Sequence, residues 1–278
     1  MRKLLFLTLL LTLALPLAGR AQQPAAPTAG LQIANPWFGK RVAYLGDSIT
    51  DERQTATQKV YWQYLEELLG IVPTVYGISG NQWHQLQQQI DRLEERQGDD
   101  FEAIFIFIGT NDFNAGVPLG EWYTTTEEQV EILPGEVVET RKLRTHTTDE
   151  QTVCGRINNV MARLKRRYPT KQIILLTPIH RALYRSTTTR RIQPDERYSN
   201  RIGLFLSDYA ARYREVADVW AIPVIDLGSI SGLYPVEDAQ ADYFRDPDGD
   251  RLHPNSKGQY RMAKAIMYQL LGYPADFE

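Results

Sequence analysis

The sequence predicts an α/β protein, a three-layer α/β/α sandwich built on a five-stranded parallel sheet. Five short apolar segments, each ending in glycine, proline or polar turn residues, alternate with segments whose apolar residues recur at helical spacing. Short apolar runs bounded by turns are typical of buried parallel strands. Their alternation with helices is typical of sheets joined by right-handed crossovers. With 278 residues, 43% of them hydrophobic, the chain is long enough to bury one such core.

The expected elements follow one another in a regular order. We expect strands at 42–45, 72–76, 103–108, 173–177 and 224–227. Helices are expected at 60–69, 83–93, 151–168, 199–220 and 256–271. The last helix is predicted to begin with a capping box formed by Ser256 and Gln259.

The first 36 residues are expected to lie outside the fold. Residues 1–21 combine Arg2 and Lys3 with an apolar run and a small-residue site at Ala21, which is the pattern of a secretory signal peptide. The run is short for a membrane span. We therefore favour a cleaved, secreted or periplasmic protein without stable membrane insertion over an uncleaved anchor. Residues 22–36 are expected to form a flexible linker before a domain at 37–278.

Composition and charge argue against several partners and cofactors. The net charge of −3 becomes −3 − 3 = −6 after cleavage, which removes three basic residues and no acid, so nothing favours nucleic acid as a partner. Cys154 is the only cysteine, and its place on the apolar face of an expected helix predicts a buried hydrophobic role. The acidic segment 246–250 lacks the glycine and glutamate positions of a calcium loop, and no zinc or phosphate-binding motif is present. We expect no metal and no cofactor.

Ser48 follows the first expected strand, and open α/β sheets bind ligands outside the carboxyl ends of their strands. This position makes Ser48 a candidate nucleophile. Among four histidines, His253 stands out because Asp250 lies three residues before it. One short turn can then place the carboxylate against Nδ1 and leave Nε2 free to accept a proton from a serine hydroxyl. The alternatives are a helix cap at Ser48 and a surface pair of Asp250 and His253.

Four segments together resemble the blocks of the SGNH (GDSL-like) hydrolase family. They are 46–50, Gly80, 109–112 and the Asp250–His253 pair, and they occur in the family's order. The resemblance implies a flavodoxin-like sheet of strand order 2-1-3-4-5. In that order the first and third strands are neighbours and their ends form a crevice.

The resemblance also implies roles for the residues of these blocks. Ser48 would attack an ester carbonyl, His253 would act as base and then as acid, and Asp250 would orient the imidazole. The oxyanion would be held by the Ser48 N–H, a backbone N–H at Gly80 and the side-chain amide of Asn111. Family members often carry asparagine before the glycine of the second block, where this chain has Tyr76–Gly77, so Gly77 is the alternative to Gly80.

A polar, threonine-rich insertion at 113–150 leaves the third strand directly after Asn111. We expect it to cover or line the crevice. Phe113, Trp122 and Tyr123 would then form a flat wall for a sugar ring or an acyl chain, and a small satellite core is the alternative.

Three further polar residues lie close to the expected crevice. His180 follows the fourth strand and is a candidate for the pocket rim, with a surface or structural histidine as the alternative. Asp47 is a candidate substrate contact, although Asp47 and Asp112 are better suited to bracing the loops through hydrogen bonds.

These observations predict an exported serine esterase that hydrolyses short-chain esters, acetyl esters above all, on a carbohydrate. The expected partner is therefore a small-molecule or glycan ester. The carbohydrate depends on export, on the aromatic insertion and on the family resemblance. A lipid esterase such as a lysophospholipase is the alternative enzyme. A carbohydrate-binding protein that keeps the fold without turnover is the alternative of another class, against which the intact Ser48, Asp250 and His253 argue.

Overall fold

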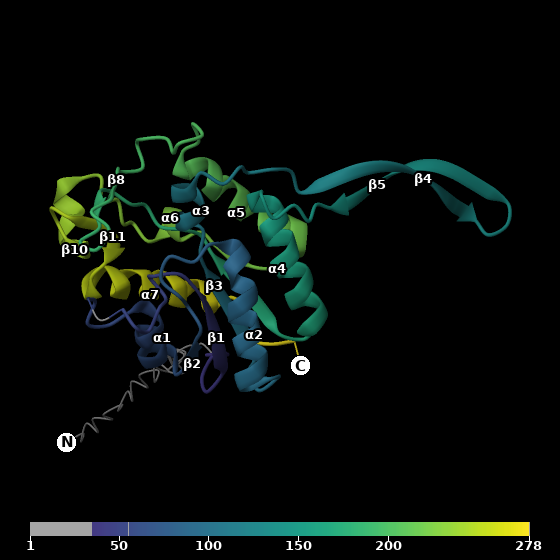
Figure 1. Ribbon diagram of the computed structural model, residues 1–278. Helices are drawn as coiled ribbons and strands as arrows, with labels where there is room; N and C mark the ends of the chain where they lie inside the picture. Colours follow the sequence, from purple (N-terminus) through teal and green to yellow (C-terminus); the bar gives the residue numbers. More distant parts are fainter. Residues whose placement is uncertain (1–34, 55, 278) are drawn as a thin grey trace, which may run out of the picture. The chain divides into compact units, whose positions relative to one another are not determined.

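Five parallel strands form the central sheet of the computed structural model (Figure 1). They are β1 (Arg41–Gly46), β2 (Val72–Val75), β3 (Ala103–Phe107), β6 (Gln172–Leu176) and β9 (Val224–Ile225). Their order is β2-β1-β3-β6-β9, with Gly46 of β1 beside Phe107 of β3. This is the order 2-1-3-4-5 that the family resemblance implies, so the predicted topology is confirmed.

Helices cover both faces of the sheet. On one face, α1 (Tyr61–Leu69) and α7 (Ser256–Leu270) pack against side chains such as Tyr44, Phe105 and Ile174. On the other face, α2 (Leu86–Gln97), α4 (Val153–Arg167) and α5 (Leu206–Trp220) pack against the alternate positions of the same strands. Because successive side chains of a strand point to opposite faces, fully apolar strands supply both cores. The predicted three-layer sandwich is confirmed.

The structure describes residues 35–54 and 56–277. The predicted signal peptide and most of the predicted linker therefore lie outside the described residues. Trp37, near the start of this range, is buried and donates its indole N–H to the carbonyl of Leu270 over 2.7 Å. Within the described part, no helix has the length and apolarity needed to span a membrane.

The amino ends of the last helix and of the helix expected at 199–220 differ from the prediction, the first in its cap and the second in its first residue. The last helix is capped by Asn255, whose Oδ1 accepts the backbone N–H groups of Lys257 and Gly258, and no capping box of Ser256 and Gln259 forms. Gln259 is buried and its side chain accepts the N–H of Tyr61 instead, which ties α7 to α1. The expected helix at 199–220 begins only at Leu206. Before it, Gly203 has a left-handed backbone with φ of +84°, and Asn200 Oδ1 accepts the N–H groups of Ile202 and Leu204.

Cys154 is fully buried on α4, as its apolar neighbours predict. Burial raises the pKa of its thiol to about 12. The thiol is therefore protonated at neutral pH and packs as a small apolar side chain.

A second, antiparallel sheet was not expected. It has the order β10-β11-β7-β8 and comprises β10 (Phe244–Asp246), β11 (Asp250–Pro254), β7 (Tyr184–Arg185) and β8 (Ile192–Gln193). The segment that carries Asp250 and His253, predicted as a turn, is thus a strand held between two others.

The short helical elements are η1 (Trp83–Gln85), α3 (Thr110–Ala115), α6 (Leu227–Ile230) and η2 (Asp238–Tyr243). Of these, α3 follows β3 directly and carries Asn111 in its first turn. This placement brings Asn111 to the carboxyl end of the sheet.

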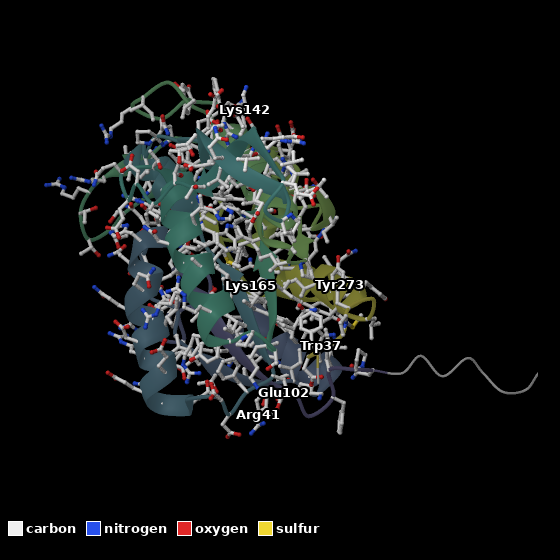
Figure 2. The ribbon with its side chains drawn as sticks, turned by 90° about the vertical axis from the view of Figure 1, so that its right-hand side faces the viewer. Trp37, Arg41, Glu102, Lys142, Lys165 and Tyr273 are labelled. Carbon is white, nitrogen blue, oxygen red and sulfur yellow. The ribbon has the colours of Figure 1, made fainter. Side chains whose placement is uncertain are left out.

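The insertion forms a long hairpin of β4 (Tyr123–Leu133) and β5 (Val137–His146) that points away from the sheet (Figure 1). Nearly all of its side chains are exposed. Figure 2 shows Lys142 of the hairpin at the opposite end of the view from Arg41 and Glu102, which pair at the amino ends of β1 and β3. The prediction that the insertion covers the crevice is wrong for this hairpin, because it points away from the sheet and none of its residues lines the cavities near Ser48 (Figure 1).

Candidate active site

Ser48, His253 and Asp250 form a continuous chain of hydrogen bonds at the carboxyl end of β1. Ser48 Oγ lies 2.9 Å from His253 Nε2, although 205 residues separate the two in the sequence. His253 Nδ1 lies 2.9 Å from both carboxylate oxygens of Asp250. His253 is only 7% exposed, so its contact with the serine is largely shielded from water.

The local backbone fixes Asp250 beneath the imidazole. Its Oδ1 accepts the N–H groups of Leu252 and His253, so the carboxylate folds back over its own strand. Burial alone would raise the pKa of Asp250, but the hydrogen bonds from the His253 side chain and from these backbone groups outweigh it and lower that pKa. Tyr184, opposite Asp250 in β7, places its ring edge-on to the imidazole with centroids 5.1 Å apart. An ionised carboxylate thus holds the ring at Nδ1.

The turn that presents Ser48 is held from both sides. Gln89 of α2, fully buried, accepts the N–H of Gly46 over 2.9 Å and donates to its carbonyl over 2.8 Å. A Cβ at Gly46 would lie 2.5 Å from the carbonyl of Phe107, so only glycine fits between β1 and β3. Gln89 escaped the sequence analysis, since a glutamine in a helix gives no sign of its distant partner.

Asp47 closes the same turn. Its carbonyl accepts the N–H groups of Thr50 and Asp51, and its Oδ1 accepts the N–H of Ile49 over 3.2 Å. Burial raises the pKa of Asp47 to about 7. Because the side chain is 3% exposed and holds backbone groups, Asp47 braces the loop.

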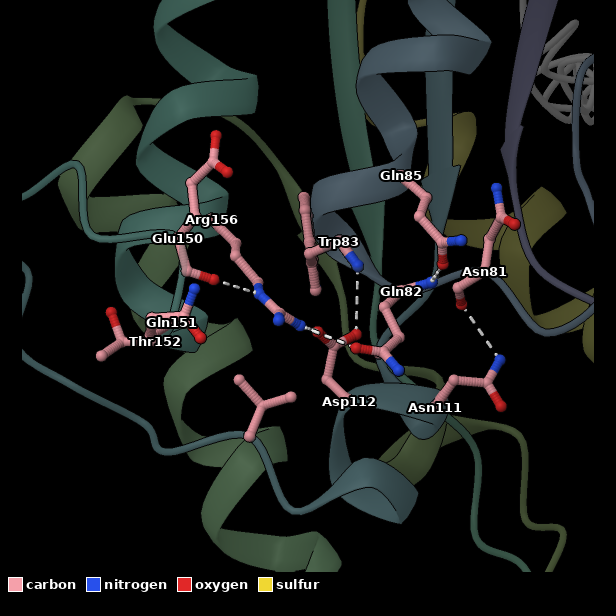
Figure 3. Close-up of polar contacts among 12 residues, drawn as sticks. Asn81, Gln82, Trp83, Gln85, Asn111, Asp112, Glu150, Gln151, Thr152 and Arg156 are labelled. Atoms are coloured by element: carbon pink, nitrogen blue, oxygen red, sulfur yellow. Dashed lines mark hydrogen bonds and ion pairs between the residues drawn. The ribbon is translucent and has the colours of Figure 1, made fainter.

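Asn111 faces this turn from the first helical turn after β3. Its Nδ2 donates to the carbonyl of Asn81 over 3.0 Å (Figure 3). The same nitrogen lies 3.4 Å from Asp47 Oδ2. Both neighbours are acceptors, so they fix the amide with its nitrogen toward the loop that carries Gly80 and Asn81. One of the two N–H bonds goes to Asn81, and the other is held only by the longer contact.

Gly77 and Gly80 differ in their surroundings. Gly77 packs against Thr50, where a Cβ would come within 2.9 Å of that side chain. Gly80 has a left-handed backbone with φ of +82° and open space around its Cβ position. Among the described residues, the backbone N–H groups of Gly80 and Ser48 have no acceptor.

A buried ion pair ties these loops together (Figure 3). Asp112 is fully buried and accepts Arg156 Nη1 over 2.8 Å and the N–H of Trp83 over 3.1 Å. Arg156, on α4, also donates to Gln82 Oε1 over 2.8 Å and to the carbonyl of Glu150 over 2.7 Å. Burial raises the pKa of Asp112 to about 6, against the pull of the Arg156 guanidinium. A bracing role for Asp112 is predictable from its place after the third strand, whereas Arg156, on a distant helix, shows no sign of this contact in the sequence.

The aromatic residues predicted as a substrate wall lie elsewhere. Phe113 packs edge-on against Tyr209 of α5, and Trp122 donates its indole N–H to Glu215 of the same helix. Both are at least 94% buried in the core between the sheet and its helices. Tyr123 packs against this core at the base of the hairpin. The predicted wall is wrong, because these apolar rings are more stable in the core than on a wet crevice.

Two cavities lie near the site. The smaller, about 10 Å³, is lined by residues that flank Ser48 and His253 and by the ends of β3 and β6: Asp47, Ile49, Phe107, Ile108, Thr110, Pro178, Ile179 and Leu252. The larger, about 190 Å³, shares Pro178 and Ile179 with it and includes His180. His180 Nδ1 lies 2.6 Å from Glu196 Oε1, and this hydrogen bond raises the pKa of the imidazole.

In the ranges 35–54 and 56–277 no group of three or more His, Cys, Asp or Glu side chains is placed to hold a metal ion. The side chains around Ser48 offer proton transfer and hydrogen-bond donation.

A parallel sheet that carries a serine, a histidine and an aspartate in hydrogen-bond contact at the carboxyl ends of its strands has the arrangement of a serine hydrolase. Residues 44–261 match the model of the GDSL-like lipase/acylhydrolase family, and the chain belongs to that family. This result confirms the resemblance seen in the sequence.

Solved structures share the fold. A protein from Lactobacillus plantarum is 22% identical, with a TM-score of 0.64 over 84% of this chain and 97% of that one. A possible lipase from Chitinophaga pinensis is 19% identical, with a TM-score of 0.62 over 84% and 99%. An acetylxylan esterase from Geobacillus stearothermophilus is 20% identical, with a TM-score of 0.50 over 86% and 97%. No curated protein matches the chain.

Proposed function

We propose that the protein is an exported serine esterase that removes a short acyl group, acetyl, from a carbohydrate. The observation that carries the short acyl group is the small cavity whose lining includes Asp47 and Ile49, on either side of Ser48 in the sequence, and Leu252, next to His253. Its volume is about 10 Å³, which is room for about one water-sized group. A methyl group is close to this size, so the cavity favours acetyl over longer acyl chains. Export rests on the signal-like sequence of residues 1–21.

The reaction follows from the hydrogen-bond chain. Ser48 Oγ attacks the ester carbonyl carbon while its proton passes to His253 Nε2, which lies 2.9 Å away. His253 then returns that proton to the alcohol oxygen as the carbon–oxygen bond breaks, leaving acetyl on Ser48. A water molecule, deprotonated by His253, attacks this ester and releases acetate. The ionised Asp250 stabilises the imidazolium in both halves of the cycle.

The developing oxyanion has three candidate donors. The N–H groups of Ser48 and Gly80 have no acceptor among the described residues, and one N–H of Asn111 is held only by the 3.4 Å contact with Asp47. Donors already oriented toward the developing charge stabilise the transition state without reorganisation, and losing one typically costs about 10²–10³ in rate.

Hydrolysis of p-nitrophenyl acetate by the purified protein tests the activity. We expect Ser48→Ala to lower kcat by at least about 10³-fold, while Ser199→Ala, at an exposed serine, keeps the wild-type rate. Absent hydrolysis would favour the non-catalytic carbohydrate-binding alternative, and equal hydrolysis by the Ser48→Ala variant would refute the role of Ser48 as nucleophile.

A chain-length series tests the acyl cavity and the lipid-esterase alternative. We expect kcat/KM to fall from acetate to butyrate to octanoate esters of p-nitrophenol. Ile179→Ala removes part of the cavity wall and so enlarges the cavity. We expect it to raise the ratio of kcat/KM for the butyrate ester to that for the acetate ester. Ile225→Ala, equally buried but outside the cavity, does not raise it. A wild-type preference for octanoate would contradict the acetyl assignment.

A further inference from the structure

The 190 Å³ cavity lies directly beyond the small cavity beside Ser48. Pro178 and Ile179, which follow β6, line both cavities, so the same two residues separate one space from the other. The far wall belongs to the start of α5, with Phe205, Leu206 and Ala210. A substrate whose acyl group lies at Ser48 can therefore extend its alcohol portion toward this space.

The walls of this cavity are largely apolar. Ile179, Leu206 and Ala210 contribute aliphatic surface, and Phe205 contributes an aromatic ring that is 44% exposed. An apolar ring left open to water at the mouth of a cavity is a preferred contact for the apolar face of a ligand.

The rim of the cavity is polar and electrically balanced. Each basic side chain already has a carboxylate partner: Arg197 with Asp195 at 2.9 Å, Arg214 with Asp226 at 2.7 Å, and His180 with Glu196 at 2.6 Å. Because a carboxylate lies beside each of them, the rim has no excess positive charge to attract an anion. Such a rim suits a neutral ligand with many hydroxyl groups.

The ion pairs also leave hydrogen-bonding groups available. Arg214 uses only Nε for Asp226, so its two Nη groups have no acceptor among residues 35–54 and 56–277. Within the described chain, Nη1 of Arg197 and Nε2 of His180 likewise have no hydrogen-bond partner. These planar groups are held in place by their partners, which lowers the entropy lost when they bind a hydroxyl group.

We propose that this cavity binds one pyranose ring of the ester's alcohol portion. The proposal rests on the esterase function proposed above and specifies where its sugar binds. The C–H face of the ring lies on Phe205 and Ile179, and its hydroxyl groups bond to Arg197, Arg214 and His180. The volume is below the roughly 300–1,000 Å³ of pockets for drug-sized ligands, which suits a single ring. A fatty acyl chain would bring the rim's charges out of water without bonding to them.

Selectivity between two acetyl esters tests the proposal. The ratio of kcat/KM for methyl 6-O-acetyl-β-glucopyranoside, which keeps three free hydroxyl groups, to that for p-nitrophenyl acetate measures the use of the sugar. We expect Phe205→Ala and Arg197→Gln each to lower this ratio about tenfold, mainly through KM of the sugar ester, which corresponds to about 1.4 kcal/mol. Phe38→Ala, at an exposed phenylalanine outside the cavity, and Arg167→Gln, at an exposed ion pair with Asp99, leave the ratio unchanged.

Binding of methyl β-glucopyranoside, which carries no ester, provides a readout independent of turnover. We expect saturable NMR shifts with the wild-type protein and weaker binding to Phe205→Ala. If p-nitrophenyl acetate is hydrolysed but both variants keep the wild-type ratio, the sugar site is refuted and the esterase stands. If Phe205→Ala instead impairs p-nitrophenyl octanoate hydrolysis selectively, the cavity takes an acyl chain and the proposal is overturned. If the wild type hydrolyses neither acetate, the esterase function itself fails.

Discussion

Replacing Arg156 by methionine tests whether the oxyanion donors are held in place from α4. Arg156 bonds to Asp112 next to Asn111, to Gln82 in the second-block loop, and to the carbonyl of Glu150 (Figure 3). Methionine keeps an unbranched, apolar stem in place of the aliphatic part of arginine and removes all three contacts. The loop that carries Gly80 and the helix that carries Asn111 then lose their shared anchor.

The expected loss of stability follows from the burial of Asp112. That carboxylate is fully buried, and breaking a buried ion pair from one side costs about 3–5 kcal/mol because it leaves a charge unpaired. The pKa of Asp112 is already about 6 with Arg156 present, and without the guanidinium it rises further. A folded-state pKa above the unfolded value gives stability at low pH that is lost as pH rises. Arg156→Met should therefore destabilise the protein far more at pH 8 than at pH 5, and adding Asp112→Asn should recover most of the loss.

The expected loss of rate follows from the oxyanion donors. Full removal of one donor costs about 10²–10³ in rate, so partial displacement of Gly80 or Asn111 should lower kcat about tenfold or more while KM changes little. The assay is p-nitrophenyl acetate hydrolysis at a temperature where the variant remains folded. Arg163→Met is the matched control, because Arg163 lies two turns further along α4 and pairs with Asp91 and Glu94 of α2. Equal kcat in the Arg156 and Arg163 variants would refute the positioning role.

Two further predictions concern a buried acid and the hairpin. The pKa of Asp47 is raised from 3.8 to about 7, so the folded protein should lose on the order of 4 kcal/mol of stability between pH 4 and pH 8 through this group. Asp47→Asn should flatten that slope in urea unfolding, and an unchanged slope would contradict the assignment. Replacing residues 125–144 by an Asn-Gly turn should leave the melting temperature and acetate hydrolysis close to wild type, because the hairpin strands pair only with each other. A large loss of either would show a contribution of the hairpin to the core or the site.

The central sheet and the Ser48 turn were predictable because their signals are local. Each strand of the sheet is a short apolar run, and the step from Leu45 to Gly46 marks where the first strand ends. Asp250 and His253 are only three residues apart, so their contact depends on one stretch of backbone. The strand order came from the family resemblance, since the pairing of strands far apart in the sequence leaves no local mark.

The features that could not be predicted are of two kinds. Some depend on contacts with residues far away in the sequence, and others lie in segments whose side chains are exposed on both faces. In the hairpin, both faces are exposed, so Thr124, Glu127 and their neighbours show no alternation of apolar and polar residues that would mark a strand. Arg156 and Gln89 look like ordinary polar helix residues until the fold brings them to Asp112 and Gly46. A cap is local, yet Asn255 and Ser256 are both good N-cap residues, and only the backbone conformation decides between them.

Around Ser48, some backbone N–H groups have hydrogen-bond partners and others do not, and the unpaired ones indicate where negative charge is expected to develop. Buried backbone groups in proteins are nearly always hydrogen-bonded, and here Gln89 satisfies both groups of Gly46 while Asp47 satisfies Ile49. The N–H groups of Ser48 and Gly80 differ, because no described residue accepts them and Gly80 lies at an exposed position. Donors that are fixed by their surroundings but open to an incoming oxygen have little to lose when charge appears on that oxygen. The bonds to Gln89 and Asp47 therefore do more than stabilise the turn, because they also fix the backbone on either side of the open Ser48 N–H.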